Sequence, residues 1–80
     1  MADLEPVRQY FLQKIGGDRS LLPKDDVSLI DEGILDSFGL AELVATIEKV
    51  YGIRVAEKDV KITNFDSIAR IGRYVDTVKK

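Results

Sequence analysis

Apolar residues recur at helical spacing in three stretches of the chain, and each stretch predicts a helix. The first stretch consists of Leu4, Val7, Phe11 and Ile15. Steps of three or four residues place these side chains on one face of an amphipathic helix. Asp3 is a suitable N-cap, Pro6 is tolerated in the first turn, and the pair Gly16-Gly17 stops the helix. We therefore predict a helix over residues 4–15.

The second stretch has the clearest helical pattern in the chain. Its apolar positions are Leu40, Leu43, Val44, Ile47, Val50 and Tyr51. They form a stripe of the width that normally faces a core. Asp36 or Ser37 is a suitable cap at its start, and Gly52 follows its last turn. The pattern predicts a helix over residues 37–51.

The third stretch predicts the last helix. Its apolar face consists of Phe65, Ile68, Ile71, Gly72, Val75 and Val78. Thr63 or Asn64 is the expected cap. Before this helix, residues 53–63 alternate too briefly to form a strand, and the chain offers no second strand to pair with them. We predict one or two short helical turns there.

Residues 16–36 show no sustained periodicity and contain glycine, proline and paired acidic residues. A connection this long is unusual inside a compact domain and is often functional. We expect its scattered apolar residues to hold it across the core, with a short helical turn within it. The elements together predict an all-α fold: a small four-helix bundle of three longer helices and one short helix, with a long loop between helices one and two. We expect one domain over residues 1–80.

Composition narrows the possible functions. The chain has 80 residues, of which 45 % are apolar and 32 % charged, as in one globular domain. It contains no cysteine and no histidine, which excludes disulfides, thiolate metal sites and Ser–His or Cys–His catalysis. Its apolar runs are too short to span a membrane, and its first residues lack the basic and apolar regions of a secretory signal. We expect a soluble, cytoplasmic protein without a metal site.

Charge is distributed unevenly along the chain. The net charge is +1 over residues 1–24, −7 over residues 25–48 and +4 over residues 49–80. The anionic segment suits basic protein surfaces rather than nucleic acid, although a solvated acidic loop is the simpler explanation. A calcium-binding loop is not supported, because glycine and leucine stand at the third and fifth ligand positions counted from Asp31.

Ser37 stands where the long loop meets the second predicted helix. Serine is a favoured N-cap, and capping alone implies no further function. A phosphoryl group attached there would, however, meet unsatisfied N–H donors and the positive end of the helix dipole. Ser37 is therefore a candidate site of modification.

Phe38 lies on the face of the second helix opposite its apolar stripe. The neighbouring positions on that outward face are Ala41, Glu42, Ala45 and Glu48. An exposed aromatic side chain among small and acidic residues is typical of a protein-docking surface. The alternative is that Phe38 folds back against the loop.

At these residues the sequence resembles the acyl carrier protein family and the related peptidyl and D-alanyl carriers. The resemblance begins with Gly-Ile-Leu-Asp-Ser-Phe-Gly at residues 33–39 and continues through the helix to Tyr51-Gly52-Ile53. A later match is Thr-Asn-Phe-Asp-Ser-Ile at residues 63–68, which resembles the start of the family's last helix. The similarity covers essentially the whole chain.

The resemblance implies a carrier and not an enzyme. A separate phosphopantetheinyl transferase would attach 4′-phosphopantetheine from coenzyme A to the Ser37 hydroxyl, and Asp36 belongs to the same motif. The thiol of that arm would carry acyl or aminoacyl groups as thioesters. This agrees with the absence of cysteine from the chain, since the prosthetic group would supply the reactive sulfur.

The resemblance also implies a partner-binding face. The family positions that meet basic patches on partner enzymes are matched here by Asp36, Glu42 and Glu48. The apolar part of that surface is matched by Phe38, Ala41 and Ala45. Charges at such a surface mainly set the encounter rate and the choice of partner. The expected partners are the transferase and the loading, acyltransferase or condensing enzymes. We expect the protein to be a monomer and not to bind nucleic acid.

Which cargo the sequence predicts depends on three departures from the family pattern. Phe38 replaces the usual leucine, while Gly39 and Lys49 stand where fatty-acid carriers often have acidic residues. Our main interpretation is an acyl carrier for fatty-acid, polyketide or related biosynthesis. The alternatives are an aminoacyl (D-alanyl or peptidyl) carrier and an unmodified helical adaptor that binds a basic protein.

Overall fold

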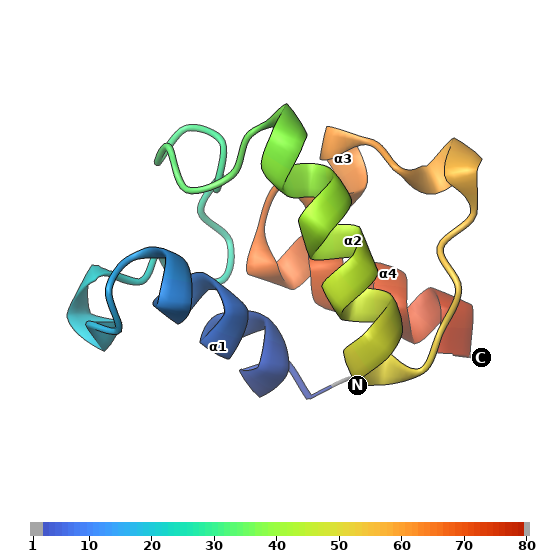
Figure 1. Cartoon of the computed structure of the whole chain (residues 1–80), viewed down its shortest axis with the longest axis horizontal. Coiled ribbons are helices and arrows are strands. Elements are labelled where there is room, and N and C mark those ends of the chain that lie inside the picture. Colours follow the sequence, from blue (N-terminus) through green and yellow to red (C-terminus); the bar gives the residue numbers. More distant parts are fainter. Residues whose placement is uncertain (1–2, 80) are drawn as a thin grey trace.

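A computed structural model describes residues 3–79 and confirms the all-α bundle (Figure 1). Its elements are α1 (Glu5–Lys14), the 3₁₀ turn η1 (Arg19–Leu21), α2 (Ser37–Tyr51), the 3₁₀ turn η2 (Glu57–Asp59), the short α3 (Ile62–Phe65) and α4 (Ile68–Lys79). The residues it describes include no strand, which agrees with helical turns over residues 53–63. Within residues 3–79 no helix is both long and apolar enough to cross a bilayer.

Helix α2 begins and ends where its capping residues predict, whereas α1 is one residue shorter than predicted at each end and has Leu4, not Asp3, at its N-cap position. Asp3 Oδ1 accepts a hydrogen bond from the Glu5 N–H at 3.0 Å, and the chain leaves α1 through two glycines in the left-handed conformation. At the start of α2, Asp36 Oδ1 accepts from the Gly39 N–H at 2.7 Å. Asp36, and not Ser37, is therefore the N-cap, and Ser37 is the first helical residue.

The prediction of a single last helix capped by Thr63 or Asn64 was wrong at its start. The chain turns at Asp66 and Ser67, so Phe65 belongs to α3. Ser67 is buried, and its Oγ accepts from the Arg70 N–H at 3.1 Å, which makes it the cap of α4. The break arises because the backbone and side chain of Asp66 bind the long loop instead of continuing the helix.

One hydrophobic core joins all four helices and the long loop. Its buried members are Val7, Phe11, Leu29, Leu35, Leu40, Leu43, Val44, Ile47, Phe65, Ile68, Ile71 and Val75. Leu29 and Leu35 come from the loop, and Leu29 is 0 % exposed. Burying a leucine side chain contributes about 2 kcal/mol. The loop is therefore part of the core, as expected from its apolar residues.

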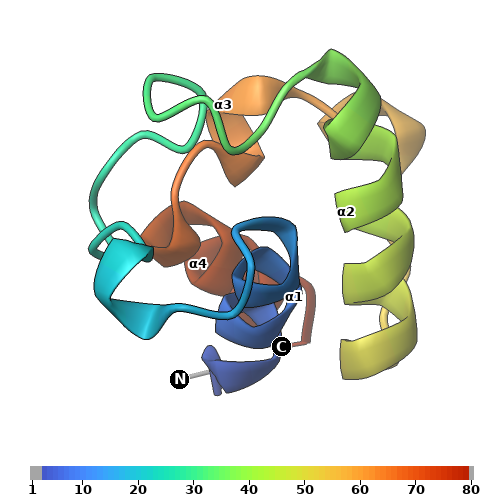
Figure 2. The same ribbon diagram turned by 60° about the vertical axis from the view of Figure 1, so that its left-hand side comes forward.

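The long loop passes beside the turn between α3 and α4 (Figure 2), and hydrogen bonds to Asp66 fix it there. The Leu29 N–H donates to the Asp66 carbonyl oxygen at 2.6 Å. Asp66 Oδ1 accepts from Ser28 Oγ at 2.8 Å and from the Ile30 N–H at 3.3 Å. Nearby, the Ala69 N–H donates to the Asp25 carbonyl oxygen at 2.8 Å. These bonds fix the position of the loop that leads into the start of α2.

Tyr51, the last residue of α2, contacts both ends of the described chain. Its hydroxyl donates a hydrogen bond to the carbonyl oxygen of Asp3, before α1. The Lys79 Nζ, at the end of α4, lies 5.9 Å from the centroid of its ring. The start of α1 and the end of α4 thus meet at the C-terminal end of α2.

We predict that Asp66→Ala destabilises the protein by about 1–3 kcal/mol, because the Ser28 hydroxyl and the Ile30 N–H lose a shared acceptor. Urea unfolding followed by circular dichroism gives the free energy, and hydrogen exchange at Leu29 and Ile30 reports the loop itself. The exposed Asp26→Ala serves as the control with the same loss of charge. Equal unfolding midpoints for the two variants would contradict the prediction.

Candidate functional site

Ser37 lies on the surface at the point where the fixed loop becomes helix α2. It is exposed, whereas Leu35 before it and Leu40 after it are 4 % and 8 % exposed. One buried leucine on each side therefore holds the exposed serine in place. Burial of this serine beneath packed side chains would have excluded attachment, and the structure shows the opposite.

The backbone around Ser37 favours a negatively charged substituent. The Asp36 carboxylate binds the Gly39 N–H, and the Asp36 carbonyl accepts from the Leu40 N–H at 2.9 Å. The N–H groups of Ser37 and Phe38 have no acceptor among residues 3–79. Free N–H groups at the positive end of a 15-residue helix stabilise an attached phosphodiester.

Gly39 allows the cap to approach the helix closely. A Cβ atom at this position would lie 3.3 Å from Asp36 Oδ1 and 3.6 Å from Leu35 Cδ1. The first of these contacts is tighter than most side chains tolerate, so a larger residue would shift the capping carboxylate. The close approach of the capping carboxylate therefore explains a glycine at position 39, independently of the acidic residue that fatty-acid carriers often have there.

Phe38 projects into solvent, with 89 % of its surface exposed. The alternative in which it folds back against the loop is therefore wrong. Ala41 and Ala45 are exposed on the same helix, as the helical pattern predicts. The small residues and the aromatic ring form an accessible face of α2, and its use as a docking surface stays a prediction.

Glu42 is not an isolated acid, because it bridges α2 to α1. Its Oε1 accepts from Lys14 Nζ at 2.7 Å and from the Tyr10 hydroxyl at 3.2 Å. The hydrogen bond from Lys14, and then that from Tyr10, lowers the pKa of Glu42. Burial, and then the bond to Glu42, raises the pKa of Tyr10. Sequence reasoning missed Lys14 and Tyr10, since contacts between two helices leave no local signal in either.

Glu48 is half-buried and holds the chain that follows α2. Its Oε2 accepts a hydrogen bond from the Val55 N–H at 3.0 Å. A carboxylate that replaces a backbone partner in this way stabilises an irregular segment. Its predicted contact with partner proteins is untested, and the structure places it away from the residues around Ser37.

A hollow of about 300 Å³ lies beside Ser37, between the end of α1 and the start of α2. Phe11, Ile34 and Leu35 give it apolar walls, while Asp36, Phe38 and Glu42 from the predicted site line it together with Tyr10 and Lys14. Ser37 itself does not line it, and neither do Ala41, Ala45 and Glu48. Within the described part of the chain, no group of three or more acidic side chains could hold a metal ion.

We predict that Lys14→Met returns the pKa of Glu42 toward its ordinary value of 4.5. Because the folded-state pKa is depressed, the pairing contributes stability above the unfolded-state pKa, and this contribution is lost as the pH falls through the folded-state pKa. Carboxyl ¹³C NMR titration measures the shift. Lys49→Met is the control with the same change of charge, and an unaltered Glu42 titration in Lys14→Met would contradict the pairing.

Comparisons with known proteins identify relatives over most of the chain. The family described as the phosphopantetheine attachment site matches residues 5–75. A D-alanyl carrier protein of Abiotrophia defectiva is 33 % identical over 64 residues, which cover 80 % of this chain and 81 % of the relative. D-alanyl carrier protein 1 of Lactiplantibacillus plantarum is 35 % identical over 54 residues, or 68 % of each chain. A D-alanyl carrier protein of Bacillus velezensis is 46 % identical over 41 residues, covering 51 % of this chain and 46 % of the relative.

Proposed function

The chain belongs to the family of the phosphopantetheine attachment site, and on this premise we propose that it is an aminoacyl carrier whose arm is attached to Ser37. The family consists of carriers rather than catalysts, and its members bear a covalently attached 4′-phosphopantetheine. The observation that carries our assignment of the residue is the exposed serine at the first position of α2.

The residues at the start of α2 fit the prosthetic group. The Ser37 oxygen is the attachment atom in our proposal, and the free N–H groups of Ser37 and Phe38 lie where they can stabilise the phosphodiester charge. Asp36 fixes the first turn of α2 by accepting a hydrogen bond from the Gly39 N–H. When bound, the group supplies a thiol that holds cargo as a thioester, while the chain itself fixes the position of the arm.

The cargo that we propose is a small aminoacyl group. The three relatives described above are named D-alanyl carrier proteins, so the comparisons support our aminoacyl alternative better than the fatty-acid or polyketide interpretation. The apolar seam between α1 and α2 supports the same conclusion. Its side chains pack so closely that they leave no room even for a water molecule. A long acyl chain therefore has no preformed place in this seam, which agrees with a small cargo held outside it.

Partner enzymes would approach the face around Ser37. We propose that Asp36, Phe38 and the adjoining alanines contact the transferase and the loading enzyme, with Glu42 and Glu48 at the edge of the contact. Acidic groups near an exposed aromatic residue favour basic partner surfaces. The chain would act as a monomeric, single carrier domain in these encounters. An unmodified adaptor is less consistent with membership of this family.

We predict that Ser37→Ala abolishes modification without unfolding the domain. Incubation with coenzyme A and a phosphopantetheinyl transferase should add the mass of one arm to the wild type and none to the variant. Unfolding should change by less than about 0.5 kcal/mol, because the capping carboxylate is that of Asp36. Ser20→Ala, at another exposed serine, should be modified normally. Modification of Ser37→Ala would refute our assignment of the residue.

The same modified protein tests the cargo. With ATP and an amino-acid-activating loading enzyme, intact-protein mass spectrometry should show a gain of one alanyl group, which hydroxylamine removes because the bond is a thioester. With a malonyl-transferring enzyme and malonyl coenzyme A, no comparable gain is expected. Preferential malonyl loading would overturn the aminoacyl proposal while leaving the attachment site intact.

We predict that Phe38→Ala lowers kcat/KM for modification by about tenfold, the scale of an aromatic side chain central to an interface. The free energy of unfolding should stay within about 0.5 kcal/mol, since the ring is almost fully exposed. Val50→Ala is the matched control, because Val50 is the other exposed large apolar residue of α2. Equal rates for the two variants would remove Phe38 from the docking surface.

A further inference from the structure

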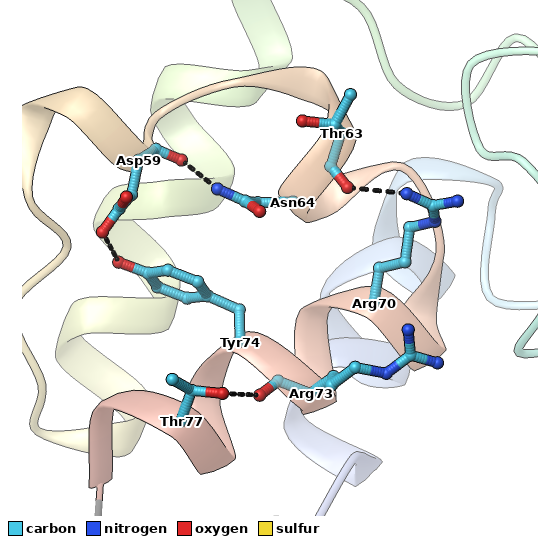
Figure 3. A pocket seen from close by; sticks show the side chains of 7 residues that line it. All are labelled: Asp59, Thr63, Asn64, Arg70, Arg73, Tyr74 and Thr77. Atoms are coloured by element: carbon cyan, nitrogen blue, oxygen red, sulfur yellow. Dashed lines mark hydrogen bonds between the residues drawn. The ribbon is translucent and has the colours of Figure 1, made fainter.

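A second hollow lies between η2, α3 and α4 (Figure 3). Its volume is about 440 Å³, and its walls include Asp59, Asn64, Arg70, Arg73 and Tyr74. None of the residues that line it belongs to α2 or to the long loop. It is therefore separate from the surroundings of Ser37, and the carrier function assigns no role to it.

Hydrogen bonds fix the side of the hollow formed by η2. The Tyr74 hydroxyl donates to Asp59 Oδ2 at 2.9 Å, and the Asn64 Nδ2 donates to the Asp59 carbonyl oxygen at 2.8 Å. The Tyr74 ring also packs against the buried Phe65, with 5.2 Å between the ring centroids. The carboxylate of Asp59 thus binds a tyrosine hydroxyl and does not pair with an arginine. This wall is preformed.

Two arginines give the hollow its positive charge. Arg70 and Arg73 are three residues apart on α4, so they are neighbours on one helix face, and Figure 3 shows both guanidinium groups at the same side of the hollow. Within residues 3–79, neither forms an ion pair with a carboxylate; the ion pairs there are Arg8–Asp25, Lys14–Glu42 and Arg19–Glu5. Two like charges side by side repel each other, and a bound anion would relieve this repulsion.

Arg70 is also held in position. Its Nη1 donates to the carbonyl oxygen of Thr63 in α3 at 2.9 Å. That bond leaves the remaining N–H groups of Arg70 available, together with the whole guanidinium group of Arg73. A planar guanidinium donates two parallel hydrogen bonds to an anion with several oxygens, and arginine is the residue best suited to phosphate.

We propose that this hollow binds the phosphate group of a small phosphorylated molecule. Phosphate offers more acceptor oxygens than a carboxylate, which suits two adjacent guanidinium groups, and the hollow has room for a small organic group beyond the phosphate. The site also gives a role to the net charge of +4 over residues 49–80, which follow the acidic residues 25–48 in the sequence.

NMR titration of the full chain with inorganic phosphate and with glycerol 3-phosphate tests the site, at an ionic strength held constant with sodium chloride. Saturable shifts are expected at the backbone amides of residues 63–77, with tighter binding of glycerol 3-phosphate. Arg73→Gln should weaken both by about tenfold. Arg54→Gln removes the same charge outside the hollow and should bind as the wild type does.

Shifts that do not saturate, or that Arg54→Gln reduces as much as Arg73→Gln, would overturn the proposal. Cosedimentation with vesicles of phosphatidylglycerol, without saturable shifts from either soluble phosphate, would overturn it in favour of a membrane surface. Modification with 4′-phosphopantetheine should be unchanged in Arg73→Gln, so failure of the phosphate site is distinguishable from failure of the carrier function.

Discussion

The position of Ser37 depends on the hydrogen bonds that Asp66 makes to the long loop. Residues 15–36 connect α1 to α2 with only one 3₁₀ turn among them, and ordering such a segment costs conformational entropy. Burial of Leu29 and Leu35 offsets part of this cost, while Asp66 satisfies polar groups of Ser28 and Ile30 that burial takes from water. The loop therefore reaches α2 at a defined place, where an exposed serine lies between buried neighbours.

The distribution of charge separates two kinds of surface on a small molecule. The anionic segment is partly neutralised within the fold, since Asp25 pairs with Arg8 and Glu42 with Lys14. The acidic face around Ser37 is therefore less negative than the sequence suggests. The exposed ring of Phe38 then makes up a larger part of what this face offers to a binding partner. On α4 the two arginines that line the second hollow pair with no carboxylate among residues 3–79, so positive charge persists on that surface.

The sequence predicts the helices well because each long helix carries a local, repeating signal. The bounds of α2 agree with prediction at both ends, and the loop's place in the core follows from its apolar residues. The break between α3 and α4 was missed because its cause, the contact of Asp66 with Ser28, joins residues 38 positions apart. The contact of Glu42 with Lys14, 28 positions away, was missed for the same reason. The partner of Glu48, the Val55 N–H, is only seven positions away, but it lies in an irregular segment without a periodic pattern. Pattern reveals which face of a helix is buried, but not which distant atom an exposed carboxylate will bind.

The contacts of Tyr51 have a practical consequence for the design of fusion proteins. Asp3 and Lys79 both meet this residue at the C-terminal end of α2, while Ser37 occupies the opposite end of the same helix (Figure 1). Fifteen helical residues separate these poles by about 22 Å at 1.5 Å per residue. An affinity handle or a solid support attached next to Asp3 or Lys79 would therefore lie far from the serine and leave it accessible to large enzymes.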